Sequence, residues 1–147
     1  MRRISAARQR VRVLALLTLS SAWLSGCGSD TPNQPSSIAG AYTATVFRVT
    51  PTGQPTIDVL AQGGSLSVTI ASDNTANGSL SIPASVAGTP FTASMTGTVA
   101  QTGTTVRFEQ TPDTFVRDLT FTVVGNTLQA TNQTAGVASF TITLTRQ

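Results

Sequence analysis

Apolar and polar residues alternate along most of residues 38–147, which is the pattern of strands with one buried face. The alternation is clearest in four segments, which span residues 65–70, 93–99, 118–123 and 138–145. Shorter alternations appear at 80–82, 106–108 and 128–130. A further run begins at Tyr42 and changes face at Phe47, which indicates a β-bulge.

Turn residues separate these segments at intervals of roughly 8–12 residues, as in an all-β sandwich or barrel. Gly125-Asn126 joins two segments directly, as a two-residue hairpin requires. No segment has helical periodicity, and at most one short turn is expected at 111–115. The short connections predict an antiparallel up-and-down meander of about eight or nine strands that closes into a barrel, with a β-sandwich as the alternative. The outward residues are threonine and serine, which argues against an outer-membrane pore.

Residues 1–24 have a different pattern, in which five arginines precede an apolar stretch at 13–24. A membrane-spanning helix needs about 20 apolar residues, so this stretch is too short for one. A basic start, a short apolar stretch and small residues after it indicate a secretory signal peptide. Residues 28–37 then contain two prolines and show no periodicity, which predicts a flexible tether.

The segment Leu24-Ser25-Gly26-Cys27 resembles the lipobox of bacterial lipoproteins. The resemblance implies that a signal peptidase recognises Leu24, Ser25 and Gly26 and cleaves before Cys27, which carries a diacylglyceryl group. Several acyl chains make release from a membrane negligible. The chain is therefore expected to comprise a signal peptide at 1–26, a lipidated cysteine and flexible tether at 27–37, and one domain at 38–147.

This resemblance also implies a location in the cell envelope. We expect the protein to be lipid-anchored on the outside of the cytoplasmic membrane or, where two membranes exist, at the outer membrane. The preference for the outer membrane rests on Gly28, because lipoproteins retained at the inner membrane commonly have aspartate after the cysteine.

Removal of the signal peptide reverses the net charge. The full sequence has nine basic and six acidic residues and a charge of +3. Five of the basic residues lie within 1–26, so four remain against six acidic residues and the charge becomes −2. The remaining chain has no basic stripe, which excludes nucleic acid as a partner. We expect a monomer that is bound to the membrane through its lipid.

The sequence contains few side chains of the types that catalyse reactions or bind metals. Histidine is absent, which excludes Ser–His catalysis and most zinc sites, so no enzyme activity, cofactor or metal is expected. Asp113 and Asp118 form either a carboxylate pair at a barrel mouth or, in the interpretation we favour, a solvated loop in which Arg117 pairs locally. Residues 71–79 contain only Asp73 as a carboxylate, so they predict a hairpin turn rather than a calcium loop.

Two short motifs at the ends of the domain resemble the lipocalins of the calycin group. They are Gly40-Ala41-Tyr42 in the first strand and Thr143-Leu144-Thr145-Arg146 in the last. Lipocalins begin with Gly-x-Trp and end with a basic residue that packs across that aromatic ring. The resemblance implies a closed barrel in which Gly40, Tyr42 and Arg146 meet at the base, with tyrosine in place of tryptophan and a cation–π contact.

The expected inward face of this barrel contains four candidate ligand-lining residues, Met95, Phe108, Phe121 and Phe140. A barrel of about eight strands is just wide enough to be filled by side chains or to hold one small ligand. Small residues on the same faces are expected to leave space; these are Gly78, Ala93, Gly97, Ala130 and Ala138.

The expected function is a membrane-anchored lipoprotein whose lipocalin-like domain binds a small apolar ligand or serves as a passive envelope module. A β-sandwich would instead favour an adhesion or assembly module that contacts protein or glycan.

Overall fold

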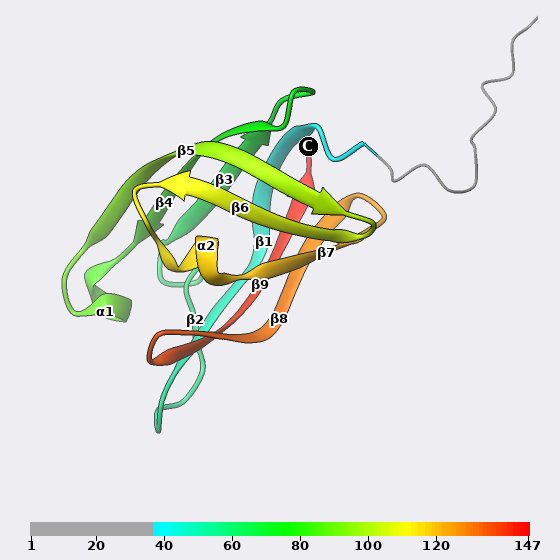
Figure 1. Cartoon of the computed structure of the whole chain (residues 1–147). Helices are drawn as coiled ribbons and strands as arrows, with labels where there is room; N and C mark the ends of the chain where they lie inside the picture. Colours follow the sequence, from blue (N-terminus) through cyan, green and yellow to red (C-terminus); the bar gives the residue numbers. More distant parts are fainter. Residues whose placement is uncertain (1–36) are drawn as a thin grey trace, which may run out of the picture. The chain divides into compact units, whose positions relative to one another are not determined.

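The computed structural model describes residues 37–147, so the expected signal peptide, the lipobox with Cys27 and most of the tether lie outside the described residues. The described part consists mainly of strands (Figure 1). In chain order the elements are β1 (Gly40–Pro51), β2 (Ile57–Asp58), β3 (Ser65–Ile70), β4 (Thr75–Ile82), α1 (Ala84–Ala87), β5 (Phe91–Thr102), β6 (Thr105–Thr111), α2 (Phe115–Asp118), β7 (Thr120–Val124), β8 (Thr127–Ala135) and β9 (Ala138–Arg146).

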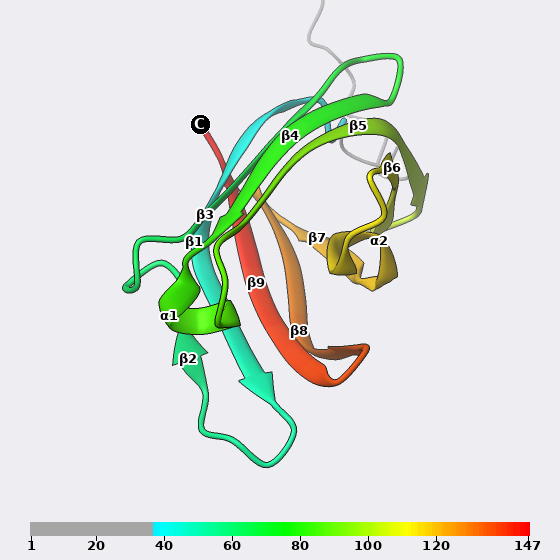
Figure 2. The same ribbon diagram turned by 90° about the vertical axis from the view of Figure 1, so that its left-hand side faces the viewer.

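The strands form one closed antiparallel barrel. In the nine-stranded sheet β2 lies at one edge, and the order then runs β1-β3-β4-β5-β6-β7-β8-β9. Because β1 also pairs with β9 over most of its length, these eight strands close on themselves and leave β2 as an extra strand on β1 (Figure 2). The predicted all-β up-and-down barrel is confirmed, and the alternative β-sandwich is wrong.

The structure contains the hairpin turn and the bulge that the sequence predicts, and one further irregularity. Gly125 and Asn126 form the two-residue connection between β7 and β8, and the φ of +56° at Gly125 is one that glycine adopts without strain. The bulge expected in the first strand lies between Ala44 and Val46. A second register shift, between Ala130 and Gln133 in β8, was not predicted.

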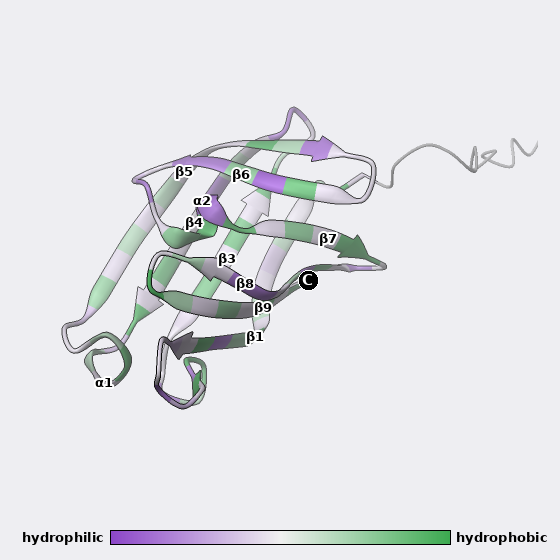
Figure 3. Cartoon of the chain, turned by 60° about the horizontal axis from the view of Figure 1, so that its bottom comes forward, coloured by the Kyte–Doolittle hydropathy of each residue, from purple (hydrophilic) through white to green (hydrophobic). Residues whose placement is uncertain are grey.

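The alternating residues bury their apolar members inside the barrel, as the banded colouring of the strands in Figure 3 illustrates. The period of two along a strand places every second side chain on the inner face. The largest fully buried side chains are Phe47, Phe108, Phe121, Leu66, Ile70, Leu80, Leu119, Leu128, Ile142, Leu144, Val59 and Val106.

Two one-turn helices interrupt the meander. The helix α2 begins at Phe115, so the turn expected at 111–115 is displaced towards the C-terminus, and α1 was not predicted at all. Each helix has only four residues, which is too short for a helical period to be recognised in the sequence. Within residues 37–147 the structure has no helix with the length and apolar character needed to cross a membrane.

The two ends of the barrel differ. One end, here called the base, carries Ser37, the C-terminus and the short turns at 71–74, 103–104 and 125–126. The opposite end, here called the mouth, carries the longer connections at 52–64, 83–90 and 112–119, together with the turn at 136–137. In Figure 1 the base faces the upper right, and α1 and β2 mark the mouth at the lower left.

The barrel wall is incomplete beside α2. Pairing between β6 and β7 ends at Arg107 and Thr120, and pairing between β7 and β8 ends at Gln129. On the mouth side, β6 therefore pairs only with β5, and β8 only with β9. The helix α2 packs beside β6 at this place (Figure 2). Gln133 bridges β8 to the start of β7, because its side-chain amide accepts a hydrogen bond from the Thr120 N–H at 2.7 Å and donates one to the Thr120 carbonyl.

Candidate functional site

The structure brings Gly40, Tyr42 and Arg146 together at the base. Tyr42 and Arg146 lie opposite each other in the register of β1 and β9. The Arg146 Cζ atom is 5.5 Å from the centroid of the Tyr42 ring, which is within cation–π range. A Cβ atom on Gly40 would lie 2.7 Å from Arg146 Nε, so a larger residue would require the Arg146 side chain to shift, and the φ of +155° at Gly40 is one that other residues rarely adopt. These three residues are called the closure cluster below.

The closure cluster also fastens the start of the domain. Arg146 Nη2 donates hydrogen bonds to the carbonyl oxygens of Ser37 at 2.7 Å and Ala39 at 2.5 Å. The Tyr42 hydroxyl donates to the carbonyl oxygen of Ile38 at 2.8 Å, and the Ile38 side chain is buried. Residues 37–39 are thereby part of the fold, and the chain that precedes them joins the barrel at its base.

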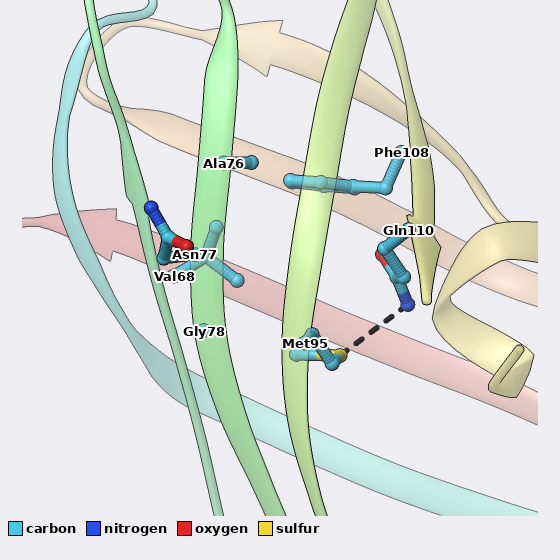
Figure 4. Close-up of a pocket in the computed structure, with 7 residues that line it drawn as sticks. All are labelled: Val68, Ala76, Asn77, Gly78, Met95, Phe108 and Gln110. Atoms are coloured by element: carbon cyan, nitrogen blue, oxygen red, sulfur yellow. Dashed lines mark hydrogen bonds between the residues drawn. The ribbon is translucent and has the colours of Figure 1, made fainter. Parts of the chain in front are cut away.

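Met95 and Phe108, two of the candidate ligand-lining residues, border a cavity that is almost filled. Its volume is about 10 Å³, which is at the lower limit for one water molecule. Figure 4 shows Met95 and Gln110 pointing towards each other across it from β5 and β6. Phe121 does not line this cavity but packs edge-on against Phe108, with ring centroids 5.4 Å apart. This part of the interior has no room for a ligand.

The expectation that small residues leave space is wrong at two of the glycines. A Cβ atom on Gly78 would lie 2.5 Å from the Ser67 carbonyl oxygen, and one on Gly97 would lie 2.0 Å from that of Glu109. Both glycines are present because neighbouring backbone approaches them closely, a role that a sequence pattern does not distinguish from the creation of space.

Phe140, the fourth candidate, belongs to an aromatic cluster at the mouth. Its ring stacks on that of Phe115 with centroids 4.2 Å apart and an interplanar angle of 4°. The Phe115 ring also lies 5.9 Å from the ring of Phe47, tilted by 35°. Phe47, Phe115 and Phe140 are called the mouth cluster below. Phe115 was not among the candidate site residues; the available signal was an aromatic residue between the charged residues Asp113 and Arg117.

A buried polar contact adjoins the mouth cluster. Gln110 and Thr114 are the buried polar residues within 37–147. The Gln110 Nε2 atom donates a hydrogen bond to Thr114 Oγ1 at 2.8 Å and lies 3.3 Å from the Met95 sulfur. Sequence reasoning missed Gln110, although the alternation of β6 places it on the inner face with Val106 and Phe108.

The charged residues near α2 lie on the outside. Arg117 pairs with Asp113 at 3.5 Å, and both side chains are largely exposed. Asp118 has no ion pair among the described residues. It borders an open surface depression of about 340 Å³ together with Arg107, Glu109 and Arg117. This arrangement fits a solvated loop, because exposed pairs contribute little free energy.

Asp73 lies in the turn between β3 and β4, where its carboxylate accepts hydrogen bonds from the hydroxyl and the N–H of Thr75 at 2.7 and 2.9 Å. These two bonds hold the pKa of Asp73 below its ordinary value. In the part of the chain that the structure describes, no three His, Cys, Asp or Glu side chains gather as a metal site would require.

Comparison with protein-family models, with curated proteins and with solved structures finds no match to this chain.

Proposed function

We propose that this chain is a lipid-anchored protein of a bacterial envelope whose barrel binds a small apolar ligand at its mouth. The observation that carries the proposal is the difference between the two ends of the barrel. The base is fastened by the closure cluster, and the chain that leads to the lipidation motif enters there. At the mouth, the ring of Phe115, from the connection at 112–119, contacts the rings of Phe47 and Phe140.

The small size of the cavity beside Met95 and Phe108 limits where a ligand can bind. The cavity beside Met95 and Phe108 has a volume of about 10 Å³, far below the roughly 300 Å³ of a typical ligand pocket. The proposal therefore locates the ligand nearer the mouth, and the half-burial of Phe115 there supports it. Apolar and aromatic lining with one or two polar groups is the usual composition of small-molecule sites, and the mouth cluster with Gln110 and Thr114 supplies it.

Lipid anchoring is tested by metabolic labelling with a radioactive fatty acid. Cys27→Ala should abolish the label and leave an unprocessed precursor, because the thiol is the acceptor. Gly28→Ala is the matched control, since it leaves Cys27 in place and should be labelled like the wild type. Label that persists in Cys27→Ala would show that the lipobox interpretation is wrong.

Ligand binding is tested by thermal unfolding of the protein extracted from its envelope. A bound ligand stabilises the folded state by RT ln(1 + [L]/Kd). Unfolding in urea, dialysis and refolding should therefore lower the Tm, and an organic extract of the envelope should restore it. An identical Tm before and after this treatment, with no response to the extract, would contradict the proposal.

A second candidate function is a protein-assembly module. The observation in its favour is exposed apolar surface at the mouth, where Val137 is 82% exposed and Phe91 42%. Single exposed apolar residues are common, so this candidate ranks second. It predicts that the protein migrates as part of a larger complex in envelope extracts and that Val137→Ser with Phe91→Ser releases it. Migration of both proteins as monomers would exclude this function.

A further inference from the structure

The ring of Phe115 occupies a slot against the face of Phe140. The Phe115 and Phe140 rings are nearly parallel, at 4° and with centroids 4.2 Å apart, whereas the Phe47 ring lies at a tilt of 35° to Phe115 with centroids 5.9 Å apart. Phe47 and Phe140 are buried, but Phe115 is half-buried. A single ring that borders solvent thus covers the flat face of a buried aromatic residue.

The segment that carries Phe115 has few hydrogen bonds to the barrel. Within 113–119 the backbone bonds are internal, from Arg117 N–H to the Thr114 carbonyl and from Leu119 N–H to the Val116 carbonyl. The bond from Gln110 to the Thr114 hydroxyl ties the segment to β6. The helix α2 is one turn long and has no side-chain cap. Such segments belong to the least stable parts of a fold.

The remaining attachment of α2 is apolar. Val116 and Leu119 are fully buried, and they keep the segment docked where β6 and β8 have separated. Rotation of the half-buried Phe115 side chain towards solvent would empty its place on Phe140, while the buried Val116 and Leu119 would keep α2 docked. The space vacated would be bounded by the face of Phe140 and by Phe47.

We propose that Phe115 is an internal stand-in for the planar aromatic ring of a ligand, which binds flat on Phe140 when Phe115 swings out. This inference rests on the proposed ligand-binding function and assigns the ligand its chemical class. Parallel stacking selects a flat ring over a saturated one, by roughly two- to tenfold in affinity. The ligand is therefore a small planar aromatic molecule.

Displacement of Phe115 has a measurable consequence for affinity. When the binding-competent state is only fractionally populated, the apparent Kd rises in inverse proportion to that fraction. Removing the Phe115 ring should therefore tighten binding of a planar probe, by about tenfold if the slot is vacant a tenth of the time in the wild type. Removing the stacking face of Phe140 should reverse this gain.

The test is a titration of the full chain with phenol and with cyclohexanol, a saturated molecule of similar size that also carries one hydroxyl. The ¹³C-labelled methyl group of Met95 is the NMR reporter, because the sequence has only two methionines and the Met95 sulfur lies 3.7 Å from Thr114 Oγ1. The proteins compared are the wild type, Phe115→Ala, Phe115→Leu, and Phe115→Ala with Phe140→Leu. Phe91→Ala is the matched control, an exposed phenylalanine outside the mouth cluster.

We expect phenol to bind Phe115→Ala about tenfold more tightly than the wild type and more tightly than cyclohexanol, with Phe91→Ala unchanged and Phe140→Leu abolishing the gain. Phe115→Leu preserves apolar packing and should show a smaller gain if the alanine variant does not fold. Equal phenol affinity in the wild type and in the Phe115 variants, or a gain that persists without Phe140, would overturn the inference while leaving the proposed function intact. Phenol binding to Phe115→Ala, with no binding to the wild type, would support a ligand site on Phe140 and would count against the proposed function.

Discussion

Arg146→Ala should destabilise the domain far more than removal of any fully exposed arginine. The guanidinium group of Arg146 makes a cation–π contact with Tyr42 and hydrogen bonds to the carbonyls of Ser37 and Ala39. The ring contact is worth about 0.5–1 kcal/mol at an exposed site and about 2 kcal/mol when desolvated. Hydrogen bonds to charged groups contribute about 1.5–3 kcal/mol each, and partial exposure reduces this to about 1 kcal/mol here. The expected loss is therefore about 2–4 kcal/mol.

The assay is urea unfolding of the domain followed by circular dichroism. With an m value of about 1.5–3 kcal/mol/M, a loss of about 3 kcal/mol lowers the midpoint by roughly 1–2 M. Arg107→Ala is the control, because Arg107 is exposed on β6 and has no ion pair within 37–147. Its cost should remain below about 0.5 kcal/mol.

A double-mutant cycle with Tyr42 separates the ring contact from the hydrogen bonds. Tyr42→Leu removes the ring and its hydroxyl, whereas Tyr42→Phe removes only the hydroxyl that donates to Ile38. Arg146→Ala combined with Tyr42→Leu should lose about 0.5–2 kcal/mol less than the sum of the single losses, since both remove one contact. Strict additivity, or an Arg146→Ala variant as stable as the wild type, would refute the role assigned to the closure cluster.

Three further predictions concern the domain itself. A chain that starts at residue 36 should be soluble, monomeric by sedimentation and rich in β structure by circular dichroism, and a helical spectrum would contradict the fold. Gly97→Ala should cost at least about 2 kcal/mol in urea unfolding, because its Cβ would lie 2.0 Å from a carbonyl oxygen of β6; an unchanged midpoint would contradict this close approach. Asp73→Asn should be less stable than the wild type at neutral pH, and the difference should disappear as the pH falls below the ordinary Asp73 pKa of 3.8, since the bonds from Thr75 favour the charged carboxylate; a pH-independent difference would argue against those bonds.

The strands were predictable because each of them carries its own local signal. Alternation in 65–70 and 138–145 identifies β3 and β9, and the glycine at 125 identifies the hairpin between β7 and β8. These features depend on a period of two and on backbone dihedral preferences, which are properties of neighbouring residues. Closure of the barrel depends instead on residues that lie far apart in the chain, and it was predicted indirectly, from the short connections between strands and from the resemblance of the end motifs to lipocalins.

The mouth was the least predictable part of the molecule. The stacking of Phe115 on Phe140 joins α2 to β9, and no local pattern encodes that pairing. The register of β8 against β9 shifts between Ala130 and Gln133, just beyond the last β7–β8 pair at Gln129, and no local pattern indicated this shift. The inward position of Gln110 was readable from alternation, but its partner Thr114 was not, because the chain turns between them. Whether the small residues leave space or allow close backbone approach also depends on the neighbouring strand.

Native mass spectrometry of the protein extracted from its own envelope tests the proposed function most directly. It reports in one spectrum the mass of the processed chain and any molecule bound to it. We expect a chain that begins at Cys27 and carries acyl groups, together with one small molecule that is released on activation and contains an aromatic ring. A chain that retains residues 1–26 without lipid, or a lipidated chain that never carries a bound small molecule, would contradict the proposal of a lipid-anchored binding protein.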